Sequence, residues 1–296
     1  MTSLRIAVVG IAGAWSTEVL ADALEARTGF RAVVNLAGAV TDFSAGTVRA
    51  SGVDLHALDG LVVKKLDKAY SPDMFPRLDV LQYLESRGVR VFSRPGCIAS
   101  MLNRLACTST LRAHEIPMPP TAVTEDLEHA AEAVRGFGHA VLKPLYSTKA
   151  RGMTLVRGDD PGLMDALRDY QGGGNPCIYV QKVLPLPDRD YGVVFLGDTY
   201  LGAYARVRGA GAWSTVSAQG GHYECYDAPA EVIELARRAG RPFGLDYTSV
   251  DVAEVDGEYV VFEVSAFGGF RGLRDGCGVD VAPRYAEHIE RELRAR

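Results

Sequence analysis

The sequence predicts a mixed α/β and α+β protein, in which a doubly wound N-terminal lobe precedes two α+β lobes. Three observations support this fold class. Short apolar runs alternate with helical patterns as far as residue 95, prolines interrupt the chain at 116–120, and most of the later strand patterns occur in hairpin-like pairs. The expected lobes are residues 1–96, 97–185 and 186–296.

The N-terminal lobe is predicted from four buried strand patterns and two helical ones. A glycine-rich turn after the first strand leads into a helix, and a second helix covers 73–87. Gly10 and Gly13 form only part of a dinucleotide fingerprint, and no acidic residue completes it, so NAD binding is disfavoured. The expected strands are 5–10, 31–37, 59–66 and 89–93.

The later elements are predicted from caps, prolines and alternating patterns. One helix carrying Leu102 to Leu111 ends at the prolines, and Thr124 is expected to cap the next helix. Gly197-Asp198 and Asp256-Gly257 lie at the turns of two hairpins. The other expected elements are strands 139–145 and 179–184 and helices 229–243 and 280–295.

Composition limits the class of protein and its partners. With 47% hydrophobic and 23% charged residues, the chain should fold, and its net charge of −5 argues against nucleic-acid or anionic membrane partners. The five cysteines include no C-x-x-C pair, so we expect them to be reduced. No leader sequence or long apolar span is evident, and the expected location is the cytoplasm.

The segment KPLYSTKARGM (143–153) joins a strand lysine to a loop rich in hydroxyl and basic side chains. Such a loop can fold closely over phosphates, because lysine supplies a point charge and glycine lets the backbone approach. The alternative is a solvated basic loop. The candidate phosphate ligands are Lys143, Ser147, Thr148, Lys149, Arg151 and Gly152.

Two acidic residues lie on neighbouring strand patterns near the C-terminus. With a three-residue loop, Val255-Asp256-Gly257, Asp251 would face Val261 and Glu263 would lie diagonally on the same surface. Ser265 joins that surface by period two, and the opposite face should be buried. Paired carboxylates suit Mg²⁺ shared with ATP phosphates, whereas the alternative is two acids on a solvated face. The expected buried face is Val250, Val252, Val260, Phe262 and Val264.

Residues 90–275 resemble the RimK-like carboxylate–amine ligases of the ATP-grasp superfamily. The resemblance rests on RPGCIASMLNRLACTSTLRAHEIPMPPT, VLKPLYSTKARGM, YVQKVL, the 190–206 hairpin and VDVAEVDGEYVVFEVSAFGGFRGL, which occur in the family's order. More narrowly, STKARGM, GVVFLG and FEVSAFGGFRG resemble the ATP-grasp proteins of the bacterial GAK system. The resemblance implies an ATP-grasp fold, with a Rossmann-like N-terminal lobe and two α+β lobes that clamp ATP.

The resemblance also implies a role for individual residues. Two departures stand out, because relatives often carry glutamate at Lys182 and usually carry asparagine at Ser265. For Arg206, Asp190 and Arg271 the alternative is that they are ordinary surface residues without a role in the site. The implied nucleotide contacts are Arg104, Lys143, Gln181, Lys182, Val183 and Asp190; the implied catalytic residues are Arg206, Lys143 and Arg271; the implied metal ligands are Asp251, Glu263 and Ser265.

The expected function is ATP-dependent ligation of a carboxylate to an amine through an acyl-phosphate, releasing ADP and phosphate. The expected cofactors are ATP and Mg²⁺, with Mn²⁺ as an alternative metal. The expected partners are small-molecule or peptide substrates, a kinase-like protein and further copies of this chain in a homo-oligomer. Two alternatives stay open, an ATP-grasp kinase that phosphorylates a hydroxyl, and a non-catalytic nucleotide-binding regulator suggested by Ser265 and Lys182.

Overall fold

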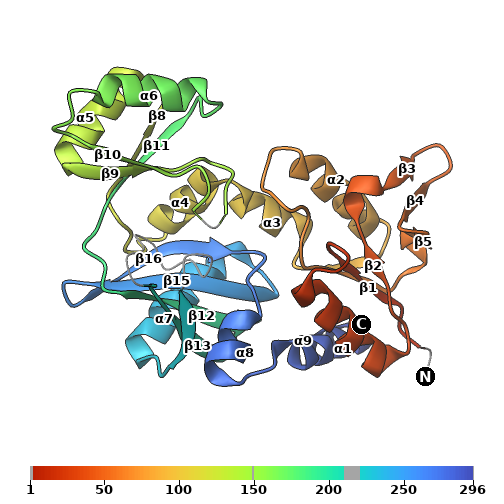
Figure 1. Ribbon diagram of the computed structural model, residues 1–296. Helices are drawn as coiled ribbons and strands as arrows, with labels where there is room; N and C mark the ends of the chain where they lie inside the picture. The colour runs from red at the N-terminus through yellow and green to blue at the C-terminus, as the bar shows by residue number, and fades with distance from the viewer. Residues whose placement is uncertain (1–2, 149, 210–220, 296) are drawn as a thin grey trace.

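The computed structural model describes residues 3–148, 150–209 and 221–295. Within this part of the chain the strands form four sheets, which are arranged as three lobes (Figure 1). The N-terminal lobe lies on the right of the view, the central lobe at the upper left and the C-terminal lobe below it. The central and C-terminal lobes therefore face one another, as expected for a nucleotide clamp.

The N-terminal lobe is built on a parallel sheet of order β2-β1-β6-β7, and its buried strands explain the apolar runs in the sequence. The small antiparallel sheet β3-β4-β5 beside it was not predicted, because its strands have only two to four residues. The elements are β1 (Ile6–Val9), α1 (Trp15–Thr28), β2 (Val33–Val34), η1 (Leu36–Gly38), β3 (Val40–Asp42), β4 (Thr47–Ala50), β5 (Val53–Asp54), η2 (Leu55–Ala57), β6 (Gly60–Val63), α2 (Met74–Ser86) and β7 (Arg90–Phe92).

The central lobe is a four-stranded sheet of order β10-β9-β11-β8 covered by two helices, and we call it the lid. Two helices lead into it rather than the predicted one, because Asn103 ends α3 and caps α4 with its side chain. Asp126, not Thr124, caps α5. The elements are α3 (Pro95–Leu102), α4 (Arg104–Ala113), β8 (Thr121–Thr124), α5 (Leu127–Phe137), β9 (His139–Leu142), β10 (Thr154–Arg157), α6 (Leu163–Gly172) and β11 (Ile178–Lys182).

The C-terminal lobe is a five-stranded sheet of order β14-β13-β12-β15-β16, and both predicted hairpins are present in it. The last helix leaves this lobe and packs beside α1 in the N-terminal lobe (Figure 1). The elements are β12 (Arg189–Leu196), β13 (Thr199–Val207), β14 (His222–Tyr226), α7 (Ala230–Gly240), η4 (Arg241–Phe243), β15 (Tyr247–Val255), β16 (Glu258–Ser265), α8 (Arg271–Cys277) and α9 (Val281–Arg294).

The β15–β16 hairpin differs from its prediction in a way that matters for the site. Its loop has two residues, Asp256 and Gly257, both with positive φ, and the predicted three-residue loop is wrong. A bulge corrects the register, since Val252 pairs with Val261 whereas Asp251 pairs with Glu263. The extra residue, Phe262, is half-buried rather than part of the core, and so is Val260. Val250, Val252 and Val264 are buried as expected.

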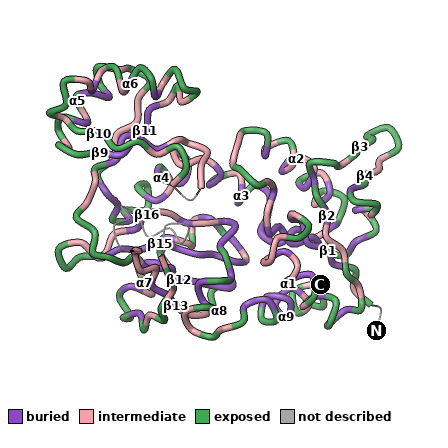
Figure 2. The backbone as a smooth tube through the Cα atoms, in the orientation of Figure 1, coloured by how far each residue is buried: buried purple, intermediate pink, exposed green. Residues whose placement is uncertain are grey.

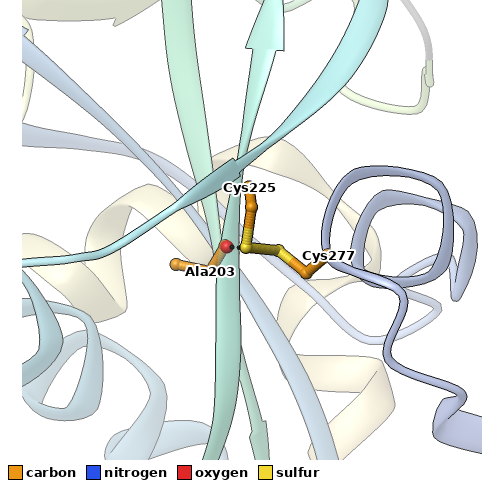
Figure 3. The surroundings of a disulfide bond; sticks show 3 residues. All are labelled: Ala203, Cys225 and Cys277. Carbon is orange, nitrogen blue, oxygen red and sulfur yellow. Dashed lines mark hydrogen bonds between the residues drawn. A yellow bond between two sulfur atoms is a disulfide. The ribbon is translucent and has the colours of Figure 1, made fainter.

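The cysteines are not all reduced, contrary to the prediction. Cys225 on β14 and Cys277 at the end of α8 form a disulfide, with Cα atoms 4.6 Å apart (Figure 3). The two residues are 52 positions apart in sequence, so only the packing of α8 against β14 brings them together. This pairing fixes the helix that begins at Arg271 to the edge of the C-terminal sheet.

Burial distinguishes the lid from the other two lobes. Buried positions follow the central strands (Figure 2), and one continuous hydrophobic cluster includes residues of both the N-terminal and the C-terminal lobe. The lid has a separate cluster built from α5, α6 and its own sheet. It is therefore a packing unit of its own. No helix in the described part of the chain is both long and apolar enough to span a bilayer.

Candidate active site

The centre of the site is the pair of carboxylates on the β15–β16 hairpin. The bulge at Phe262 places Asp251 directly opposite Glu263, and Ser249 opposite Ser265 one step further along the same face. The sequence correctly predicted a shared face for Asp251, Glu263 and Ser265, although the bulge produces it rather than the loop. Glu263 faces the lid side, because its carboxylate lies 3.4 Å from the guanidinium of Arg104 and its charge acts on Lys143.

Arg206 on β13 holds two acidic side chains together. Its guanidinium donates to Asp190 at 2.7 Å and lies 3.0 Å from Asp251. Burial lowers the pKa of Arg206, but the carboxylates of Asp251 and Asp190 outweigh this and raise it well above its usual value. Burial raises the pKa of Asp251 to about 6, with Arg206 opposing the rise. The arginine therefore helps to keep Asp251 ionised near neutral pH.

Arg104, at the start of α4, connects the lid to the carboxylate pair. Its guanidinium lies 3.4 Å from Glu263 and donates to the Pro144 carbonyl and to the Ser147 hydroxyl. Its backbone N–H also donates to the carbonyl of Leu145. Both the side chain and the backbone of Arg104 therefore hold the start of residues 143–153, which we call the lid loop. A cation thus lies between the candidate metal ligands and the loop expected to cover phosphates.

Lys143 follows β9 directly and is only 9% exposed. Its ammonium donates to the Gln181 side chain at 2.5 Å, and Gln181 in turn donates to Thr121. Burial, with a contribution from Arg104, lowers the pKa of Lys143 to about 7. The charge of this buried side chain, which would attract an anion, therefore depends on pH in the physiological range.

The rest of the lid loop contacts the N-terminal lobe. Arg151 donates to the hydroxyl of Thr148 at 2.9 Å and to the carbonyl of Lys68 in the N-terminal lobe. Gly152 has a positive φ of 69°, which permits the turn. Lys149 lies outside the described residues. The loop therefore lies against the N-terminal lobe, and Arg104 links its Ser147 to Glu263 of the C-terminal sheet.

The remaining candidates are placed at the edges of the site. Lys182 is exposed and its N–H donates to the carbonyl of Pro120, while the N–H of Val183 donates to the carbonyl of His139. These two residues therefore lie at the end of β11, where the chain leaves the sheet of the lid. Arg271 lies apart from the carboxylate pair, although the sequence predicted it beside the site. Its guanidinium lies 5.3 Å from the ring of Trp15 in α1, which places it between the N-terminal and C-terminal lobes.

The carboxylates fit a magnesium ion shared with a nucleotide. Within the described ranges, no group of three or more His, Cys, Asp or Glu side chains could enclose a metal. Mg²⁺ does not need such a group, since it is commonly held by one or two carboxylates, several waters and substrate phosphates. Asp251 and Glu263 supply two carboxylates, and Ser265 supplies a hydroxyl on the same face.

Comparison with known proteins shows the family of the chain. Residues 101–289 match the model of the RimK-like ATP-grasp domain. The chain belongs to the RimK-like ATP-grasp family. It is 25% identical over 255 residues to the tetrahydromethanopterin:alpha-L-glutamate ligase of Methanosarcina acetivorans, covering 81% of this chain and 79% of the relative. It is 30% identical to the same enzyme of Methanococcus maripaludis over 214 residues, covering 71% and 72%.

Further members of the family extend the comparison. The ribosomal protein bS6–L-glutamate ligase of Escherichia fergusonii is 26% identical over 212 residues, which are 71% of each chain. A RimK domain ATP-grasp protein of Sphaerobacter thermophilus superposes with a TM-score of 0.74 at 24% identity, covering 96% of this chain and 98% of that one. The ATP-grasp ligase PsnB, complexed with minimal precursor, Mg and ADP, gives 0.72 at 19% identity and 99% coverage of both.

These findings confirm the predicted fold and class of enzyme. This RimK-like chain is an ATP-dependent carboxylate–amine ligase, and ATP and Mg²⁺ are the cofactors typical of its family. Two residues beside the site escaped the sequence analysis. Phe262 was predicted on the buried face opposite the carboxylates, but the bulge leaves it half-buried beside Lys143. Tyr179, whose hydroxyl lies 2.8 Å from Thr108 and 3.4 Å from the Gln181 amide nitrogen, gave no signal because it lies in an ordinary strand pattern.

The low pKa of Lys143 predicts that nucleotide binding takes up protons. Above pH 7 its ammonium loses its proton in the free enzyme, and nearby phosphate charge favours the protonated form. We expect Mg-ATP binding at pH 8 to take up about one proton, and affinity to fall roughly tenfold per pH unit above 7. Calorimetry in buffers of different ionisation enthalpy measures the uptake. An unchanged uptake in Lys143→Met would contradict the assignment.

Proposed function

We propose that this ligase joins the amine of an acidic amino acid, with L-glutamate as the first candidate, to a carboxylate of a small molecule or peptide. One observation carries the proposal: Glu263, of the carboxylate pair on β15–β16, interacts with two cations on the lid side, Arg104 at 3.4 Å and Lys143. Glutamate is favoured because the similar enzymes named above are glutamate ligases.

The nucleotide and the metal would be bound by different residues. Lys143, Arg104 and the lid loop would bind the phosphates, and the end of β11 at Gln181-Lys182-Val183 would hold the adenine base. Asp251 and Glu263, with Ser265, would hold Mg²⁺, or Mn²⁺ in its place. Bound ATP supplies the phosphoryl group that converts the substrate carboxylate into an acyl-phosphate.

Arg206 and Arg271 would act on the substrate side. Arg206 contacts Asp251, and it would stabilise negative charge on the transferring phosphoryl group and on the acyl-phosphate. Asp190 would orient this arginine through their 2.7 Å hydrogen bond. Arg271, between the lobes, would attract the carboxylate of an acidic amino acid.

Isotope transfer tests the reaction. The enzyme is incubated with Mg-ATP, L-glutamate and a panel of di- and tricarboxylates and glutamate-ended peptides, each labelled with ¹⁸O in its carboxylates. We expect amide products by mass spectrometry and one ¹⁸O in the released phosphate, with L-glutamine a much poorer amine donor. A stable phosphorylated product without an amide would instead identify a kinase, and nucleotide binding without any turnover would identify a regulator.

The kinase-like partner and the homo-oligomer stay predictions from the sequence. Size-exclusion chromatography with light scattering, alone and after mixing with the kinase-like protein, tests both. A monomer that does not bind this partner would contradict them.

A further inference from the structure

Lys64 is a buried cation outside the residues assigned so far. It directly follows β6 in the N-terminal lobe and is only 3% exposed. Its ammonium donates to the carbonyl of Gly268 and lies 4.2 Å from the ring of Phe270 and 5.4 Å from that of Tyr247. Among the described residues, no carboxylate lies within ion-pair distance of it. The charge is therefore shared between one carbonyl and two aromatic faces.

The stability of the fold does not explain this lysine. Burial, with a smaller contribution from Lys65, lowers the pKa of Lys64 to about 7, which shows that its charged form is poorly solvated. A buried cation without a carboxylate partner is costly, and an apolar side chain of similar length would fill the space without that cost. Such a group is therefore a candidate for a functional role.

Lys64 contacts the segment that follows the candidate metal strand. This segment, residues 266–270, begins after Ser265 and ends before Arg271, and we call it the connecting segment. It has little freedom at Gly268, where an added Cβ would lie 2.7 Å from the Cβ of Ser249. The backbone of Gly268 is therefore bonded to Lys64 through its carbonyl and packed closely against Ser249.

Two further contacts come from the N-terminal lobe. Tyr70 packs edge-on against Phe267, with ring centroids 5.8 Å apart, and Trp15 lies against Arg271. The N-terminal lobe thus contacts the connecting segment at Phe267 and Gly268 and the residue that follows it, Arg271. None of these residues belongs to the hydrophobic cluster of the lid.

We propose that Lys64 is a positioning residue that holds the connecting segment, and through it Ser265 and Arg271, in place for the amino-acid substrate. It acts on the substrate side of the cleft, because its contacts are with the segment before Arg271 and not with the lid that would cover ATP. The kinetic part of this proposal rests on the proposed function, since it takes L-glutamate as the amine substrate.

The test compares Lys64→Met with Lys68→Met, which removes an exposed lysine from the same part of the chain. We expect Lys64→Met to raise KM for L-glutamate about tenfold or more, the effect of losing a hydrogen bond to a charged group. KM for ATP should stay within about twofold of wild type, and Tm should be unchanged or higher. With MgADP bound, amide hydrogen exchange in 266–272 should become faster while exchange in 143–153 does not. Lys68→Met should change none of these values.

Two results would overturn the proposal. One is unchanged exchange in 266–272, and the other is a lower Tm together with equal rises in both KM values, which indicates a merely structural role. If wild type does not use L-glutamate, the proposed function fails, but the exchange experiment with MgADP still decides the role of Lys64. Should Lys64→Met not fold, Lys64→Gln, which keeps a neutral donor, allows the same comparison.

Discussion

Replacing Glu263 by glutamine is expected to lower kcat/KM by about 10²- to 10³-fold, because a metal site worth several kcal/mol would keep only one carboxylate. Glutamine has nearly the same size, so the hairpin should be retained. The change also removes the charge that lies 3.4 Å from Arg104, and thereby frees a cation next to the lid loop. The measurement is the rate of ADP release as a function of Mg²⁺ concentration, where higher Mg²⁺ should recover part of the loss.

Glu258→Gln is the matched control for this prediction. Glu258 lies on the same strand but is exposed at the hairpin end, where it pairs with Val255. Its replacement should leave ADP release within about twofold of wild type, as is usual for surface substitutions. If Glu263→Gln keeps the wild-type rate and Mg²⁺ dependence, the carboxylate pair is not the metal site.

The hairpin shows how far the sequence could predict this site. Period-two alternation on both strands correctly predicted which carboxylates share a face. It also predicted an unbroken ladder, and with that assumption only a three-residue loop brings Asp251 and Glu263 together. Asp256-Gly257 is a strong signal for a two-residue turn, and the protein uses it. The bulge at Phe262 reconciles the two, and the alternating pattern of the strands carries no signal for it.

Other differences have the same physical origin. The Cys225–Cys277 pairing requires α8 to pack on β14, and the place of Arg271 requires α1 to approach α8. Both are contacts between elements far apart in sequence. In contrast, Lys143 and its loop follow one strand directly, so the sequence was enough to propose them together. The lobe boundaries at 96 and 185 remain predictions.

Replacing Arg206 by methionine is expected to destabilise the fold and to abolish most activity. The change leaves Asp190 and Asp251 largely buried without their shared cation, which should lower the free energy of unfolding by about 3 kcal/mol. It also removes the group that opposes the rise in the pKa of Asp251, so this carboxyl should be more protonated near pH 7 and bind metal less well. Urea denaturation and ADP release measure the two effects.

Arg208→Met is the control, because Arg208 lies two residues further along the chain and pairs with the largely exposed Asp188. An exposed pair contributes little, so stability should change by less than about 1 kcal/mol. A second change separates the two effects of Arg206. Adding Asp190→Asn to Arg206→Met removes one of the two charges that Arg206 contacted and should recover part of the lost stability, whereas turnover should stay low because Asp251 still lacks the Arg206 cation. If the double variant recovers activity together with stability, Arg206 has only a structural role.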